Sequence, residues 1–143
     1  TVQPPVIVLD ASVISAALGR RPRLVGRDEP IAKEVSRILG SAEPCFVPGI
    51  AAQEFLSGAQ SPEQESHLDA LIEKFPIRPA TVQEYRIAAR ISNECRWNGV
   101  TAGSADCLIA AQTLAANGAR FTLDRDFERM APLCGLKLWR TAR

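Results

Sequence analysis

Residues 103–131, GSADCLIAAQTLAANGARFTLDRDFERMA, contain the signals of a helix, a strand and a second helix in direct succession. The first part is rich in alanine and ends at Asn117 and Gly118, residue types that favour a helix C-terminus. ARFTLD (119–124) is typical of a strand, and DFERMAPL (126–133) is typical of a short helix. A strand between two helices is the unit from which α/β proteins are built.

The rest of the chain alternates in the same way. VIVLD (6–10) is an apolar, β-branched run typical of a buried parallel strand, and CFVPG (45–49) is a second. PIRPA (76–80) is a weak third strand, and LKLW (136–139) is the last. These elements predict an α/β sandwich around a mainly parallel sheet of four to five strands. Further helices are predicted over 11–18, 31–39, 50–59, 61–75 and 81–97.

The overall composition restricts the class of protein. Of 143 residues, 46% are hydrophobic and 23% are charged, so we expect one soluble globular domain over residues 1–143. The apolar runs are far shorter than the ~20 residues that cross a bilayer, and the first residues do not have the pattern of a secretory signal. The cysteines have no paired spacing, which indicates reduced thiols in a cytoplasmic protein: Cys45, Cys95, Cys107 and Cys134.

Five carboxylates are predicted at the carboxyl edge of the sheet, where α/β proteins bind ligands. Asp10 and Asp124 each end a strand, and Asp126 follows at the start of a helix. Glu54 lies in the helix after the second strand, and Asp106 lies in the first turn of the alanine-rich helix. Each aspartate alone has a structural interpretation, because aspartate stabilises helix N-termini, and Glu54 could lie on an exposed face. The combination of all five at one edge favours a functional site.

This acidic cluster predicts a bound metal ion. Two like charges ~4 Å apart cost about 4 kcal/mol at an effective dielectric of ~20. No lysine lies close in sequence to offset the carboxylates. A divalent cation would neutralise them, and all-oxygen ligands select Mg²⁺ or Mn²⁺ over zinc. Because the only histidine, His67, lies in a polar stretch, hydrolysis of a phosphodiester at carboxylate-bound metal is the reaction that fits.

The basic residues leave a nucleic-acid contact open. The net charge is only +1, but four arginines cluster in a loop that also contains glycine and proline: Arg20, Arg21, Arg23 and Arg27. Arginine binds phosphate oxygens through two parallel hydrogen bonds. The cluster has two interpretations, an RNA phosphate contact or a solvated loop.

Four segments, in this order, carry a family resemblance: IVLDASVI (7–14), PGIAAQEFLSGA (48–59), residues 103–131 and GLKLW (135–139). In them the chain resembles the PIN-domain family, in particular the VapC-type ribonuclease toxins of bacterial toxin–antitoxin pairs. The third segment is the most specific, because LIAA followed by a strand ending in TLDRDF is hard to obtain by chance. The resemblance implies a three-layer α/β/α sandwich and a Mg²⁺-dependent endoribonuclease that cleaves single-stranded or looped RNA.

The resemblance also implies roles for single residues. Asp10 and Asp106 match the principal metal ligands, and Glu54 matches the glutamate that binds metal or assists the attacking water. Asp124 and Asp126 complete the acidic pocket, with Asp124 the more direct metal ligand. Two hydroxyl side chains match residues that support the metal ligands: Ser12 and Thr122.

The expected partners are RNA, a small VapB-like antitoxin and a second copy of the chain, with helices 31–39 and 81–97 as the dimer surface. A different class stays open, namely a catalytically inactive PIN-like module that binds RNA or protein. Two other classes do not fit the spacing. A HAD-type phosphatase needs an aspartate where this chain has Ser12, and a receiver domain places its acidic residues differently.

Overall fold

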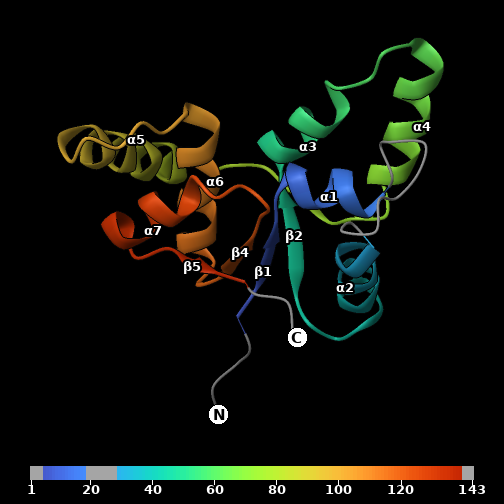
Figure 1. The fold of residues 1–143 in the computed structure, drawn as a ribbon, viewed down its shortest axis with the longest axis horizontal. Coiled ribbons are helices and arrows are strands. Elements are labelled where there is room, and N and C mark those ends of the chain that lie inside the picture. The colour runs from blue at the N-terminus through green and yellow to red at the C-terminus, as the bar shows by residue number, and fades with distance from the viewer. Residues whose placement is uncertain (1–4, 19–28, 140–143) are drawn as a thin grey trace.

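The sheet consists of five parallel strands in a computed structural model that describes residues 5–18 and 29–139 (Figure 1). The strand order is β3-β2-β1-β4-β5, and every pairing is parallel, where the sequence predicted a mainly parallel sheet. The strands within the described residues are β1 (Ile7–Leu9), β2 (Cys45–Pro48), β3 (Ile77–Arg78), β4 (Ala119–Phe121) and β5 (Lys137–Leu138).

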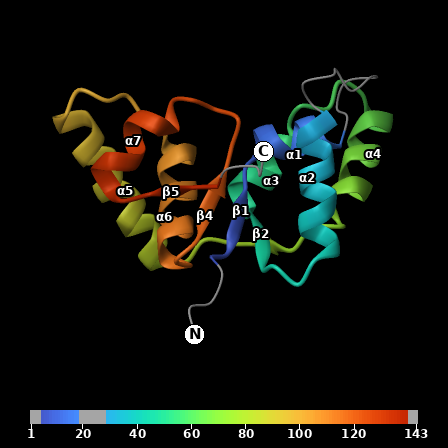
Figure 2. The ribbon, with the colours of Figure 1, turned by 60° about the horizontal axis from the view of Figure 1, so that its bottom comes forward.

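Helices cover both faces of this sheet. The same described ranges contain α1 (Ala11–Ala17), α2 (Glu29–Gly40), α3 (Gly49–Leu56), α4 (Pro62–Ile72), α5 (Val82–Trp97), α6 (Ser104–Ala115) and α7 (Phe127–Cys134). Figures 1 and 2 show α5, α6 and α7 on one side of the sheet and α1 to α4 on the other. Each side has its own hydrophobic cluster, one around Phe55 and Ile38 and one around Ile91 and Met130. The predicted three-layer α/β/α sandwich is confirmed.

Local sequence signals explain the start of two helices. Ser61 caps α4 and Pro62 is its first residue, as the sequence predicted. Thr81 and Glu84 form the predicted capping box at the start of α5. Several predicted elements are shorter than expected, among them strand 119–124, which ends at Phe121. There the hydroxyl of Thr122 accepts a hydrogen bond from the backbone N–H of Asp124, which turns the chain out of the sheet.

The return from α6 to the sheet brings two strand ends to one edge. Asn117 has a φ of 52°, and Gly118 lies so close to β1 that a Cβ atom there would be 2.6 Å from the carbonyl oxygen of Val6. Only glycine fits this approach. β4 then pairs with β1, and the backbone N–H of Asp10 donates to Phe121. The residues after β1 and after β4 therefore meet.

Two further observations concern the described residues. No helix in residues 5–18 and 29–139 combines the length and the apolar character needed to cross a membrane. The four cysteines all lie in these ranges, and each has a free thiol.

Candidate active site

Asp10 is the most constrained of the five predicted carboxylates. It follows β1 directly and is only 6% exposed. Its Oδ1 accepts from the backbone N–H of Ala11 at 2.8 Å, so it caps α1. Its Oδ2 accepts from the Thr122 hydroxyl at 2.6 Å and from the Ser12 hydroxyl at 3.2 Å. The structural and the functional interpretation of Asp10 are thus compatible, because the cap uses one oxygen and leaves the other directed at the site.

The hydroxyls of Ser12 and Thr122 connect β1 to the loop after β4. Ser12 accepts from the backbone N–H of Leu123 at 3.0 Å, and Thr122 accepts from that of Asp124 at 3.1 Å. The two hydroxyl oxygens are 3.4 Å apart. Both residues lie against Asp10, where the sequence placed them as supporting side chains. Their contacts hold the Asp10 carboxylate in one orientation.

Arg120 is the central residue that sequence reasoning missed. Its side chain is fully buried on β4, and its Nη2 lies 3.3 Å from Oδ2 of Asp10 and 3.7 Å from Oδ1 of Asp106. Its Nη1 donates to the backbone carbonyl of Asp106 at 3.3 Å. The guanidinium carbon lies 3.2 Å from the ring centroid of Phe127, a cation–π contact. Burial lowers the pKa of Arg120, whereas the two carboxylates oppose that shift.

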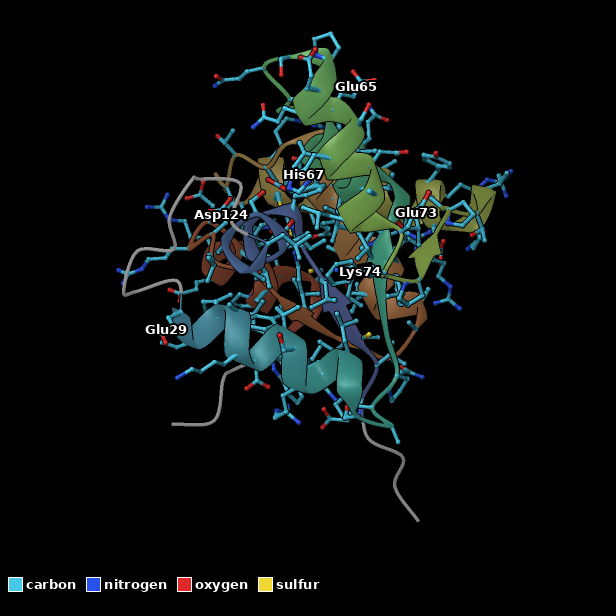
Figure 3. All side chains as sticks on the ribbon, turned by 90° about the vertical axis from the view of Figure 1, so that its right-hand side faces the viewer. Glu29, Glu65, His67, Glu73, Lys74 and Asp124 are labelled. Carbon is cyan, nitrogen blue, oxygen red and sulfur yellow. The ribbon has the colours of Figure 1, made fainter. Side chains whose placement is uncertain are left out.

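This arginine corrects the expectation that the acidic cluster lacks an internal counter-charge. The counter-charge is an arginine on β4, and no lysine takes this place. Lys33 pairs with Glu29 at 3.5 Å. In Figure 3, Lys74 at the end of α4 lies on the right, whereas Asp124 lies on the left. A signal was available, because Arg120 is the only charged residue between Asp106 and Asp124.

Asp106 lies in the first turn of α6, where the sequence placed it, and its side chain is 34% exposed. Burial raises the pKa of Asp106, and the charge of Arg120 partly offsets this shift. The carboxylates of Asp10, Asp124 and Asp126 raise the pKa further. The structure therefore brings these three acids within electrostatic reach of Asp106.

Glu54 lies on α3 with an exposed side chain, so it does face solvent. Burial of part of its surface raises the pKa of Glu54, and the charges of Asp10 and Asp106 raise it further. Arg120 acts in the opposite direction. Glu54 is therefore an exposed carboxylate of the cluster, and its pKa depends on the charges of Asp10 and Asp106.

Asp124 and Asp126 are exposed and form the outer part of the cluster. The backbone N–H of Asp126 donates to Oδ1 of Asp124 at 2.9 Å, so the loop is held by its own side chain. The arginine cluster that the sequence offered as an RNA phosphate contact lies outside the described residues: Arg20, Arg21, Arg23 and Arg27.

The donor set matches a hard divalent cation in its chemistry. Carboxylate oxygens are the ligands that Mg²⁺ and Mn²⁺ prefer, and Asp10 and Asp106 already face one positive charge, that of Arg120. Within residues 5–18 and 29–139, no three acidic, histidine or cysteine side chains converge into a ready metal-binding group. The residues fit a metal ion by type, with two carboxylates directed at a common cation.

The fold and the site together define the class of this protein. It is an α/β/α sandwich with a parallel sheet, and it has an acidic site at the carboxyl edge of that sheet. The PIN domain family matches residues 7–133, and the chain belongs to this family. The resemblance seen in the sequence is confirmed at that level.

Solved structures share the fold. FitAcB from Neisseria gonorrhoeae has a TM-score of 0.73 at 20% identity, covering 94% of this chain and 97% of that chain. VapBC-1 from nontypeable Haemophilus influenzae has a TM-score of 0.73 at 22% identity, covering 96% and 99%. DNA-bound VapBC from Salmonella typhimurium has a TM-score of 0.73 at 17% identity, covering 95% and 98%. At such identities the likeness concerns the fold.

Proposed function

We propose that this protein is a Mg²⁺-dependent endoribonuclease, the VapC-type toxin of a toxin–antitoxin pair. The observation that carries the proposal is the convergence of Asp10 and Asp106 on one cationic group at the carboxyl edge of a PIN-domain sheet. Together with Glu54, Asp124 and Asp126, these carboxylates carry more negative charge than the Arg120 guanidinium offsets, and their oxygens are the ligands that Mg²⁺ and Mn²⁺ prefer.

The carboxylates of the site would have two different roles, metal binding and proton transfer. Asp10, Asp106 and Asp124 would hold the ion, with Asp126 next to them. When bound, a divalent cation lowers the pKa of water and stabilises charge on the phosphodiester oxygens. Glu54 would accept a proton from the attacking water as the bond from the water oxygen to phosphorus forms. The bond from phosphorus to the ribose oxygen breaks, and that oxygen takes up a proton from solvent and leaves as an alcohol. The raised pKa and the exposed position of Glu54 suit it to this proton transfer.

Metal dependence of RNA cleavage tests the proposal. The purified chain is incubated with single-stranded RNA in Mg²⁺, in Mn²⁺ and in excess EDTA. We expect cleavage in either metal and none with chelator. Undiminished cleavage in EDTA would overturn the mechanism, and absence of cleavage under all conditions would favour the inactive binding module.

A matched pair of glutamate variants locates the activity. Glu54→Gln removes the proposed proton acceptor and should lower the cleavage rate about 100-fold. Glu73→Gln makes the same chemical change at the end of α4, on the opposite side of the view from Asp124 in Figure 3, and should leave the rate unchanged. Equal rates for both variants would remove Glu54 from the mechanism.

We also propose a VapB-like antitoxin as partner and a homodimer. The exposed apolar residues of α5 support a protein interface, with Val82 69%, Tyr85 57% and Trp97 70% exposed.

The free thiols support a reducing compartment, the cytoplasm, where RNA is accessible. Light scattering of the isolated chain should report a dimer. Growth arrest of a bacterial host on expression, relieved by a co-expressed antitoxin, tests the toxin assignment, and unimpaired growth would contradict it.

A further inference from the structure

Arg120 carries a positive charge that is buried and fixed in position beside the acidic site. Its side chain is fully buried on β4, and its Nη1 donates to the backbone carbonyl of Asp106 in the first turn of α6. Its guanidinium carbon lies 3.2 Å from the ring centroid of Phe127, where α7 begins. An arginine on a surface can rotate away from an approaching cation, whereas this one is held from two sides. An ion that binds to the inner acids therefore meets this charge.

The contact between Arg120 and the inner acids is electrostatic more than hydrogen-bonded. Nη2 lies 3.3 Å from Oδ2 of Asp10 and 3.7 Å from Oδ1 of Asp106. Neither Nη2 nor Nε has a hydrogen-bond partner of good geometry among the described residues. Burying such donors costs free energy, and an apolar side chain would pack against Phe127 without this cost. The positive charge of Arg120 is therefore what it contributes to the site.

The orientation of Asp10 does not depend on Arg120. Oδ1 accepts from the backbone N–H of Ala11, and Oδ2 accepts from the hydroxyls of Ser12 and Thr122. These three hydrogen bonds hold the carboxylate without the arginine. Loss of the guanidinium should therefore remove a charge from the site and leave this carboxylate in place.

We propose that Arg120 is a resident cation that weakens the binding of a divalent metal ion to Asp10 and Asp106 and stabilises the metal-free site. The proposal rests on the proposed function, because it takes this pocket to be the metal site. Positive charges a few ångströms apart repel each other, and solvent screens this repulsion poorly at a buried group. The carboxylates still attract the ion, but half-occupancy should need a higher free metal concentration than it would beside a neutral residue at position 120.

Arg120 is a positioning residue in this scheme, because it contacts the metal ligands and is too buried to touch RNA. The proposal predicts two effects of opposite direction when its charge is removed. The metal-free protein becomes less stable, because the carboxylates lose their counter-charge, and the metal ion binds more tightly. A purely structural role predicts lower stability together with weaker metal binding.

Titration with Mn²⁺ in the absence of RNA, with the free ion followed by electron paramagnetic resonance, tests the first effect. The dissociation constant of Arg120→Met should be lower than that of wild type by about 10-fold or more. Arg120→Lys keeps the charge and should bind Mn²⁺ like wild type. Arg96→Met is the matched control, because it removes an exposed arginine charge at the end of α5 and should also bind like wild type. An equal or higher dissociation constant for Arg120→Met would overturn the proposal.

Thermal melting tests the second effect. In EDTA, Arg120→Met should melt below wild type, and Mn²⁺ should raise its melting temperature more than that of wild type. A rise no larger than in wild type would contradict the proposal. If Arg120→Met does not fold, Arg120→Gln takes its place in both measurements, because it also removes the charge but keeps a hydrogen-bond donor. Failure of both variants to fold in Mn²⁺ would overturn the proposal, since Arg120 would then be needed for packing.

The inference and the proposed function can fail separately. Equal Mn²⁺ affinity in wild type and Arg120→Met, together with EDTA-sensitive RNA cleavage by wild type, would overturn the inference and leave the proposed function intact. Tighter Mn²⁺ binding by Arg120→Met, with no RNA cleavage by wild type in any metal, would do the reverse. Absence of Mn²⁺ binding to both chains would overturn the inference.

Discussion

Asp10 and Asp124 both follow a strand of the same sheet, yet they differ in burial and in hydrogen bonding. Asp10 is almost buried, accepts three hydrogen bonds and lies 3.3 Å from a guanidinium nitrogen. Asp124 is exposed and accepts a hydrogen bond from its own loop. The position of an acid at a strand end therefore does not determine its environment. The neighbours that the fold supplies decide whether the carboxylate is an oriented ligand or a solvated charge.

The inner carboxylate should be the most sensitive position in the molecule. Asp10→Asn leaves the charge of Arg120 partly uncompensated and replaces an acceptor of two hydroxyl groups by an amide. We expect a loss of about 3 kcal/mol in the free energy of unfolding, measured by urea denaturation in EDTA, and cleavage at background. Asp124→Asn is the control, with a stability change below about 0.5 kcal/mol for an exposed site. Similar losses for both variants would erase the distinction between inner and outer acids.

Thr122 links the two regions, so its variants sharpen the comparison. Thr122→Val removes the donor to Asp10 and the acceptor for the N–H of Asp124. The free energy of unfolding should fall by about 1–2 kcal/mol, and the cleavage rate should fall about 10-fold or more. Thr122→Ser retains the hydroxyl and should behave like wild type in both measurements. A Val variant with the wild-type rate would show that the orientation of Asp10 does not limit cleavage.

The fold disfavours the ionised form of Asp106, as the raised pKa of this carboxyl indicates. Asp106→Asn should therefore raise the free energy of unfolding in EDTA on the order of 1 kcal/mol, reduced by solvent screening, while cleavage is lost. Mg²⁺ should raise the melting temperature of this variant less than that of wild type. A lower melting temperature in EDTA with retained cleavage would make Asp106 a helix-start residue only.

The pH dependence of stability should have a definite sign. The pKa values of Asp106 and Glu54 are raised in the folded state, so the folded chain binds more protons than the unfolded chain above the ordinary value of about 4. The metal-free protein should therefore lose stability as pH rises from that value through the raised pKa values. Urea denaturation in EDTA at several pH values measures this small slope. The slope should shrink in Asp106→Asn, and an unchanged slope would assign it to other groups.

Much of the architecture was predictable because its signals are local. The capping box at Thr81 and Glu84, and the cap at Ser61, depend on residues within one helical turn. Strand boundaries were less accurate, since the end of β4 depends on the Thr122 side chain bonding to the next turn. The sequence predicted the acidic residues at the carboxyl edge of the sheet, because parallel strands all end on the same side of a sheet.

The amino-acid sequence by itself determined the order of helices and strands, the family and the set of acidic residues at one edge. These properties follow from the periodicity of apolar residues along the chain and from the side-chain chemistry of each residue, which does not depend on its position in space. The tertiary structure alone decided that Arg120 lies between Asp10 and Asp106. That placement requires β4 to pair with β1, with partners such as Val8 and Arg120 that lie 112 positions apart in the sequence, and α6 to begin near the strand ends. Electrostatic interaction depends on distance in space and on burial, and neither is present in the order of the residues.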